Sequence, residues 1–491
     1  MNEFAYSPGV AAYVQRGQEM TAAEETRRAH MRRMRFDTIA VHGLYGMEAA
    51  LANQGSIIEP GYLSAAQHFE NSDHMEAALA YLMPSWTYSR IANPTTHYLE
   101  ETLALLEGYG FEGEVSALVT ASGMAAVFMA THPFLARDGV LTRPNIVVSA
   151  KCYGGSYMLF QQRYGVERGV EVRWVRDPLD MAEWESHIDE ETRFVYGEMP
   201  SNPSLAVMDI PGLAELAHAH GLPLIVDSTV ASPALLRPLS LGADIVIHSV
   251  SKSMAASGFA IAGAVIARHE IPSRVGPDDM RRNFATYLKL LPFRDQGPGL
   301  SPFNALMILN DLRTLRSRMD ILSRHTMQVA DFLQRHPGVE AVFYPGLEEV
   351  RGHDTAARVM WLADGEDDYG VPVNRFGHLM GFTVRGGAAA ARAVFDRLEL
   401  IWRATDLGRI KSVATIPAIS THQQQGEEGR ELAQLPRNLV RLSVGGEHPG
   451  DVIADLEQAL DGAARTFAVA ARSGGQKRDV LSEMPFPEGV N

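Results

Sequence analysis

The stretch ADIVIHSVSKSM, residues 243–254, decides both the fold and the chemistry expected of this chain. Its first half contains the apolar run IVI, residues 245–247, which is typical of a strand buried on both faces of a parallel sheet. The run ends in a polar group that contains Ser249, Ser251 and Lys252. A lysine just past a buried strand is costly unless it has a partner or a reaction to perform. The other residues that the fold brings to Lys252 therefore decide its role.

Strand-like and helix-like segments alternate from about residue 115 to residue 267. Strands are predicted in GEVSALVTASG (113–123), NIVVSA (145–150), FVYGEMP (194–200), LPLIVD (222–227), ADIVIHSV (243–250) and AIAGAVIA (260–267). This alternation predicts an α/β fold with a mostly parallel sheet that helices cover on both faces. Beyond residue 300, further strand-like and helix-like segments predict a second, smaller C-terminal α/β unit.

Asp227 closes the predicted strand LPLIVD, and Lys252 follows the next strand along the chain. Because ligands lie outside the carboxyl ends of parallel strands, both side chains are expected at the same edge of the sheet. A buried lysine can form a Schiff base, and a buried carboxylate can hold a protonated heteroaromatic nitrogen. Pyridoxal phosphate requires this pair, although the spacing alone is equally compatible with a structural ion pair.

The stretch TASGMAAVF, residues 120–128, offers donors for a phosphate. Ser122 is expected to cap a helix whose first free N–H groups belong to Gly123 and Met124. The start of a helix is a ready anion site, although small residues before a helix more often form only a cap. By itself this stretch indicates a helix start that could receive a phosphate.

The composition excludes several classes of function. The 491 residues carry 44 Lys and Arg against 59 Asp and Glu, a formal charge of -15, which repels nucleic acid and anionic lipid. The apolar run FAIAGAVIA (259–267) is far shorter than a membrane span, and the first residues lack the pattern of a signal peptide. The single cysteine, Cys152, fits a reducing cytoplasm. We expect a cytoplasmic protein without nucleic-acid or membrane partners.

Five regions are expected along the chain. They are an N-terminal arm (1–35), a segment contributing to a neighbouring subunit (36–100), a large domain (101–320), a small domain (321–465) and a tail (466–491). Within the arm, a short helix is predicted near Thr21 and Glu24, which are spaced as a capping box. The arginines of this helix are expected either to face solvent or to dock on a neighbouring subunit.

Taken together, eight stretches resemble the Cys/Met-metabolism family of pyridoxal-phosphate enzymes, which includes cystathionine γ-synthase, methionine γ-lyase and O-acetylhomoserine sulfhydrylase. They are YSRIANPTTHYLEETLALLEG, TASGMAAV, YGGSYMLF, EMPSNP, LIVDSTVASP, GADIVIHSVSKS, GLSPFNALMILNDLRTLRSRM and NLVRLSVGGEHPGDVIADLEQAL. They run in order from about residue 36 to 463. The resemblance implies a fold-type I, aspartate aminotransferase-like architecture with a seven-stranded large domain, and a homotetramer built as a dimer of dimers.

The resemblance also implies a role for each matching residue. Lys252 is expected to link the cofactor, Asp227 to pair with its ring nitrogen and Tyr153 to stack on the ring and serve as acid or base. Arg441 is expected to bind the substrate carboxylate, with help from Ser412. The other implied cofactor ligands are Asn202 for the phenolic oxygen, then Ser122, Gly123, Met124, Ser249 and Ser251 for the phosphate, with Tyr88 and Arg90 supplied by a neighbouring subunit.

Several positions depart from the family pattern or add little to it. Lys411 stands where cystathionine-using members often carry Glu, so we expect it to repel an ammonium group and to make cystathionine a poorer substrate. Cys152 is interpreted as a packing residue rather than a nucleophile. His248 and His422 lack metal-ligand spacing, and no metal is predicted.

The resemblance implies a transferase or lyase that acts at Cγ of an amino acid. The favoured reaction is γ-replacement on an activated homoserine, through a vinylglycine-type intermediate. The alternatives are a γ-lyase that releases a 2-oxo acid and ammonia, and carbon–carbon bond formation at Cγ with S-adenosylmethionine. A transaminase and a cofactor-binding protein without catalysis are the rivals from other classes.

Overall fold

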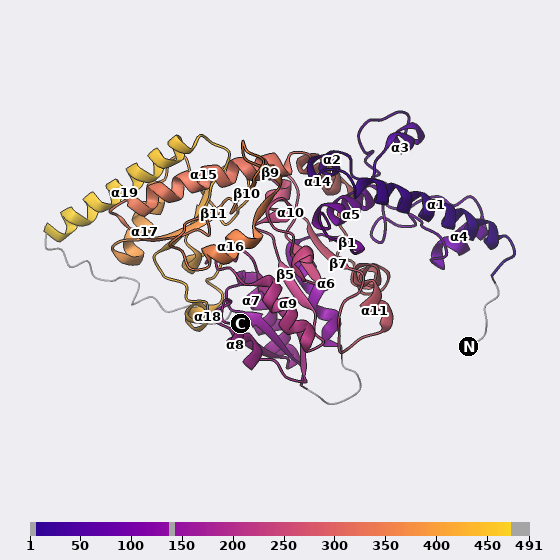
Figure 1. Ribbon diagram of the computed structural model, residues 1–491, viewed down its shortest axis with the longest axis horizontal. Helices are drawn as coiled ribbons and strands as arrows, with labels where there is room; N and C mark the ends of the chain where they lie inside the picture. The colour runs from indigo at the N-terminus through magenta and orange to yellow at the C-terminus, as the bar shows by residue number, and fades with distance from the viewer. Residues whose placement is uncertain (1–5, 137–142, 473–491) are drawn as a thin grey trace.

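Figure 1 shows the computed structural model of the chain, which describes residues 6–136 and 143–472. At its centre lies a seven-stranded sheet with the order β1-β7-β6-β5-β4-β2-β3. The strands β2 to β6 run parallel, whereas β7 is antiparallel to both of its neighbours. Their bounds are β1 Val115–Thr120, β2 Asn145–Ser149, β3 Glu171–Val175, β4 Thr192–Glu198, β5 Leu224–Asp227, β6 Ile245–His248 and β7 Gly263–Arg268. The mostly parallel seven-stranded sheet is thereby confirmed.

The sheet strands are apolar because both of their faces are buried. Alternate residues of a strand point to opposite faces, so Val246 of β6 packs in one core while Ile245 and Ile247 pack in the other. The helices α5 (Pro94–Glu107), α9 (Ile210–Ala219) and α14 (Pro302–Leu312) contribute to the first core. The helices α6 (Gly123–Thr131), α7 (Gly154–Met158) and α12 (Phe284–Leu288) contribute to the second. This arrangement leaves the carboxyl ends of β4, β5 and β6 together at one edge.

The C-terminal part of the chain forms a second, smaller sheet with the order β12-β13-β14-β11-β8. Most of its pairs are antiparallel, and only β12 and β13 run parallel. The bounds are β8 Val339–Phe343, β11 Leu379–Val384, β12 Trp402–Arg403, β13 Val413–Thr415 and β14 Leu439–Ser443. Apolar residues of α15 (Leu315–Arg335), α17 (Gly387–Asp396) and α19 (Pro449–Arg472) fill its core. In Figure 1 these helices lie on the left, beyond the large sheet.

The N-terminal helix differs from the expected one. The helix α1 spans Val10–Met31, so Thr21 lies in its interior, where its hydroxyl donates to the carbonyl of Gly17. The predicted capping box at Thr21 is therefore wrong, because the helix begins eleven residues earlier. In Figure 1, α1 projects to the right of the sheet with α4 (Ser72–Leu79) packed along it.

The arginines of this arm are mostly paired within the chain. Arg28 binds Glu101 at 2.7 Å and Arg32 binds Glu114 at 2.6 Å, and Arg27 and Arg35 pair with Glu48 and Asp364. These contacts fix the end of α1 against α5 and the start of β1. The expectation of a solvated face is therefore wrong for Arg27, Arg28 and Arg32, which are partly buried, while Arg33 and Arg35 are exposed.

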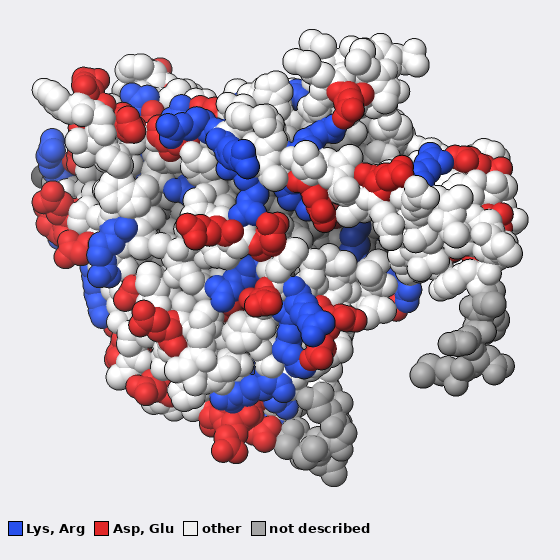
Figure 2. Space-filling view, turned by 45° about the vertical axis from the view of Figure 1, so that its right-hand side comes forward, with Lys and Arg blue, Asp and Glu red and all other residues white. Residues whose placement is uncertain are grey.

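Acidic and basic side chains alternate over the face shown in Figure 2, without a continuous basic patch on that face. Within residues 6–136 and 143–472, no helix combines the length and apolarity needed to cross a membrane. The helix α19 continues to Arg472, past residue 466 where the tail was expected to start, and residues 473–491 lie outside the described part of the chain.

Candidate active site

A cavity of about 230 Å³ opens at the carboxyl ends of the large-sheet strands, where the small domain meets them. It is lined by residues from both sheets and from the loops between them. They include Ser122, Gly123, Met124, Tyr153, Glu198, Asn202, Asp227, Thr229, Ser249, Ser251, Lys252, Thr405, Leu407 and Arg441. Most of the residues singled out from the sequence therefore lie around one space, as the edge rule for parallel strands predicts.

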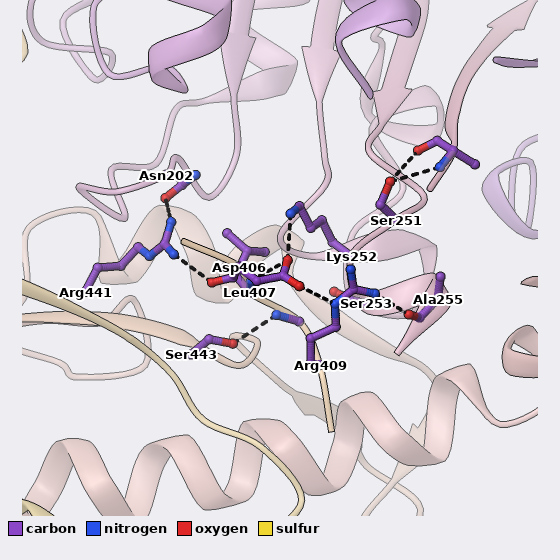
Figure 3. A network of polar contacts seen from close by, with 12 residues as sticks. Asn202, Ser251, Lys252, Ser253, Ala255, Asp406, Leu407, Arg409, Arg441 and Ser443 are labelled. Atoms are coloured by element: carbon purple, nitrogen blue, oxygen red, sulfur yellow. Dashed lines mark hydrogen bonds and ion pairs between the residues drawn. The ribbon is translucent and has the colours of Figure 1, made fainter. Parts of the chain in front are cut away.

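Lys252 reaches this cavity from the turn after β6. Its Nζ donates to Oδ1 of Asp406 at 2.7 Å, a contact between residues 154 positions apart in the chain. The other carboxylate oxygen of Asp406 accepts from Nε of Arg409 at 2.6 Å. Figure 3 shows Asp406 between Lys252 and Arg409, at the junction of the two domains. The lysine is thus positioned by its turn and held by a carboxylate of the small domain.

Two buried carboxyl groups stand side by side at the edge of the sheet. Asp227 ends β5 and Glu198 ends β4, and the two are direct register partners. Burial raises the pKa of Asp227, and burial together with the charge of Asp227 raises the pKa of Glu198 well above its usual range. Glu198 accepts the main-chain N–H groups of Tyr153 and Asn202. A cation placed in this cavity would restore the ionised form of Asp227.

The start of α6 faces the turn that follows β6. Ser122 caps this helix, because its hydroxyl accepts the N–H of Ala125 at 3.1 Å, which confirms the predicted cap. A Cβ at Gly123 would lie 2.6 Å from Cβ of Ser249, so only glycine allows this close approach. The main chain of a helix start and the hydroxyl of Ser249 therefore line one small region, as an anion requires.

Arg441 lies fully buried on β14, across the cavity from the large sheet. Its two terminal nitrogens donate to Oδ1 of Asn202 at 2.9 Å and to the carbonyl of Asp406 at 2.7 Å. Its Nε has no hydrogen-bond partner within the described residues. Burial lowers the pKa of Arg441 to about 10, which leaves the guanidinium charged at neutral pH. The residue is a buried cation with a free donor beside the cavity.

Tyr153 precedes α7 and lines the cavity, with its ring edge-on to His422 at 6.5 Å between centroids. Burial lowers the pKa of His422 to about 4, so this imidazole is neutral at neutral pH. Ser251 also lines the cavity, but its hydroxyl both donates to the carbonyl of Ala262 and accepts the N–H of Ala262. The phosphate role of Ser251 stays a prediction.

Four predicted site residues are not among the residues that line the cavity. The hydroxyl of Ser412 donates to Glu447 at 2.9 Å, and Nζ of Lys411 lies 4.6 Å from the centre of the Trp402 ring. These contacts do not place the side chain of Ser412 or of Lys411 beside Arg441 or Lys252. Tyr88 is half-exposed, with the guanidinium of Arg90 over its ring. Their predicted role at a neighbouring subunit's site stays a prediction.

The predicted packing role of Cys152 leads to a chemical test. Its side chain is buried, and burial raises the pKa of the thiol well above its ordinary value. Because the thiolate is the reactive form, we expect iodoacetamide to leave Cys152 unmodified in the native protein and to alkylate it after denaturation in guanidinium. Mass spectrometry of the intact chain measures this directly. Rapid alkylation of the native protein would contradict the packing role.

The residues around the cavity fit pyridoxal phosphate. Asp227 and Glu198 form a buried acidic site, and neither makes a salt bridge within residues 6–136 and 143–472, which suits the ring nitrogen of a protonated pyridine. The start of α6, kept open by Gly123, suits the phosphate. The amine of Lys252 suits the aldehyde. Fold and site together define a pyridoxal-phosphate-dependent enzyme.

Residues 37–461 match the family model of the Cys/Met metabolism PLP-dependent enzymes, and the chain belongs to this family. It is 33% identical over 455 residues to the O-acetyl-L-homoserine sulfhydrylase of Leptospira meyeri, covering 87% of this chain and 97% of that protein. It is 34% identical over 411 residues to an L-methionine gamma-lyase of Fusobacterium nucleatum subsp. polymorphum, covering 83% of this chain and 94% of that protein. The family resemblance inferred from the sequence is confirmed.

Solved structures agree with this assignment. The structure of metB from Corynebacterium glutamicum superposes with a TM-score of 0.75 at 31% identity, covering 88% of this chain and 99% of that one. A candidate O-acetylhomoserine (thiol)-lyase, metY, from Campylobacter jejuni superposes with a TM-score of 0.76 at 32% identity, covering 87% of this chain and all of that one. The latter contains N'-pyridoxyl-lysine-5'-monophosphate. Pyridoxal phosphate is thereby confirmed as the cofactor of the family to which this chain belongs.

Two residues of the site were missed in the sequence. Glu198 closes β4 as Asp227 closes β5, so the same strand-end rule would have found it in EMPSNP. Asp406 lies in a loop without apolar periodicity, and only the packing of the two domains brings it to Lys252. The first omission had a signal in the sequence, whereas the second had none.

Proposed function

We propose that this enzyme catalyses γ-replacement on an activated homoserine, such as an O-acyl derivative. The observation that carries the proposal is the convergence of Lys252, Asp227 and Arg441 on one cavity. Relatives named as O-acetyl- and O-succinylhomoserine sulfhydrylases support this class of substrate. When bound, pyridoxal phosphate supplies an electron sink that stabilises negative charge at Cα and next to it.

Each residue has a defined task in this proposal. Asp227 holds the ring nitrogen protonated, and the buried N–H groups of Arg441 bind the α-carboxylate and so fix the orientation of the substrate. The amine of Lys252 takes the proton from Cα and moves a proton at Cβ. The hydroxyl of Tyr153 donates a proton to the leaving group at Cγ. Buried, preorganised groups cost little reorganisation during these steps.

The second candidate function is γ-elimination, which several relatives named L-methionine gamma-lyase favour. Use of S-adenosylmethionine for carbon–carbon bond formation is a further variant of the same Cγ chemistry. The deciding experiment is product analysis with O-acetylhomoserine in the presence and absence of a thiol. A thioether or thiol product that forms only with the added nucleophile supports replacement. A 2-oxo acid and ammonia formed at the same rate without it would contradict replacement.

The quaternary structure and location are part of the proposal. We propose a homotetramer, a dimer of dimers, in which residues 36–100 of one subunit bring Tyr88 and Arg90 to the phosphate of the next subunit's site. The domain limits at residues 101–320 and 321–465 and a cytoplasmic location are proposed with it. The Tyr88 ring is half-exposed, and Arg90 is not among the described residues that line the cavity of its own chain. Both observations are compatible with this arrangement.

Arg441→Lys tests the carboxylate site. Lysine retains the charge but loses the planar fork, so we expect KM for the amino acid to rise roughly 10- to 100-fold with a smaller change in kcat. Steady-state kinetics with O-acetylhomoserine measures both values. The matched control is Arg375→Lys, which changes a small-domain arginine that pairs with Asp320 away from the cavity. An unchanged KM in Arg441→Lys would contradict the assigned role.

A further inference from the structure

The carboxylate of Asp406 is the acidic group next to Lys252 on the small-domain side. Although its burial opposes ionisation, the charges of Lys252 and Arg409 hold the pKa of Asp406 below its usual value. Its side chain is 33% exposed. Asp406 is not itself among the described residues that line the cavity, but its chain neighbours Thr405 and Leu407 are, and its carboxylate contacts Nζ of Lys252, which also lines it. A charged carboxylate thus stands beside the lysine at the edge of the cavity.

The loop that carries Asp406 is held rigidly against the lysine turn. Arg409 also donates through Nη1 to the carbonyl of Ala255 at 2.6 Å, which ties the loop to the large domain. At Gly408, where φ is +73°, a Cβ would lie 2.6 Å from the main-chain nitrogen of Ser253. The position of Asp406 is therefore fixed by its surroundings, as a recognition group requires.

Charges of opposite sign stand next to each other here. Arg441 donates to the carbonyl of Asp406, so the guanidinium and the carboxylate belong to one small region, which Figure 3 shows. Arg441 suits an anionic end of the substrate. If the amine of Lys252 were taken up by the cofactor, Oδ1 of Asp406 would keep the main-chain N–H of Leu407 as a donor, and Arg409 would remain on the other oxygen. Oδ1 would then have no cationic partner among the described residues.

We propose that Asp406 is a specificity-determining residue that selects substrates with a positively charged substituent on Cγ, such as a sulfonium or an ammonium. This inference rests on the proposed Cγ chemistry and narrows its substrate class. A sulfonium leaves as a neutral thioether, so the Cγ–S bond breaks with its electron pair on sulfur and no proton needs to be supplied. Lys411, with its Nζ over the Trp402 ring, does not counter this charge inside the cavity.

A matched pair of substrates tests the selection. Methionine and S-methylmethionine differ by one methyl group and one positive charge, and both replacement and elimination break the same Cγ–S bond. Methionine then releases methanethiol, and S-methylmethionine releases dimethyl sulfide. The measured quantity is the ratio of kcat/KM for S-methylmethionine to that for methionine in the cofactor-loaded enzyme. The change of this ratio between variants is diagnostic, because a sulfonium is also intrinsically the better leaving group.

We expect Asp406→Asn to lower the ratio roughly 10-fold or more, because it removes the charge at nearly constant volume. Asp406→Glu keeps the charge and is expected to retain most of the ratio. Asp320→Asn is the control, since Asp320 also pairs with an arginine of the small domain, at 2.5 Å, whereas Asp406 pairs with Lys252 as well. It is expected to leave the ratio unchanged.

Two outcomes would overturn the selection. The first is an unchanged ratio in Asp406→Asn; if both values of kcat/KM fell equally, Asp406 would hold the α-ammonium that the two substrates share. The second is the absence of turnover of S-methylmethionine by the wild-type enzyme while O-acetylhomoserine is consumed. Failure of the wild-type enzyme to consume any of these amino acids would instead contradict the proposed function.

Discussion

Lys252→Ala is expected to reduce turnover at Cγ by roughly 10³-fold or more, because one side chain both links the cofactor and moves the protons. Lys252→Arg sharpens the test. Arginine keeps a cation near Asp406, and so preserves the ion pair that Lys252 makes at 2.7 Å. Its guanidinium stays protonated and cannot form an imine or act as a base. Both variants are therefore expected to be inactive, measured as product formed from O-acetylhomoserine in the presence of a thiol.

The comparison of the two variants distinguishes the loss of the reactive amine from the loss of the ion pair with Asp406. If the loss came from the broken ion pair alone, Lys252→Arg would recover most of the activity. Unfolding in urea provides the control, because both chains must retain a cooperative transition near that of the wild type. Activity of Lys252→Arg close to that of the wild type would contradict the assigned role of the lysine.

Asp227→Asn is expected to lower kcat about 10²-fold or more, because the ring nitrogen loses the buried carboxylate that keeps it protonated. The neighbouring Glu198 provides a matched control on the adjacent strand. Burial and the charge of Asp227 raise the pKa of Glu198 and so favour its neutral form, which makes Glu198→Gln a conservative change of similar size. We expect Glu198→Gln to retain much more activity than Asp227→Asn, and the absorbance of the bound cofactor to change in Asp227→Asn only.

Equal losses in the two variants would contradict this division of roles. They would mean that the pair acts as one unit, and that Asp227 alone is not the partner of the ring nitrogen. Steady-state kinetics at saturating cofactor and substrate distinguishes the two cases, since it reports kcat without the effect of weaker binding.

The sheet and its catalytic edge were predictable because they follow from local patterns. Buried strands have continuous apolar runs, and Asp227 and Lys252 follow two of them directly. The family resemblance added Arg441 and Asn202, which the structure brings together at 2.9 Å. Neither could have been placed from periodicity, since Arg441 lies on β14 of the small sheet and Asn202 in the turn after β4 of the large one.

Other features depend on tertiary packing and were not predictable. The spacing of Thr21 and Glu24 fits a helix start, but α1 begins at Val10 and packs on α4 along the preceding residues. The contact between Asp406 and Lys252 requires the small domain to fold over the large one. The hydroxyl of Ser412 is bound to Glu447, a contact across 35 residues that one sequence does not reveal. The assistance of Ser412 to Arg441 stays a prediction.

The covalent site is tested most directly by reductive trapping. Purified protein loaded with pyridoxal phosphate is treated with borohydride, digested and mapped by mass spectrometry. A pyridoxyl-phosphate adduct is expected on the ε-amine of Lys252. An adduct at another lysine, with Lys252 unmodified in fully loaded protein, would contradict this expectation.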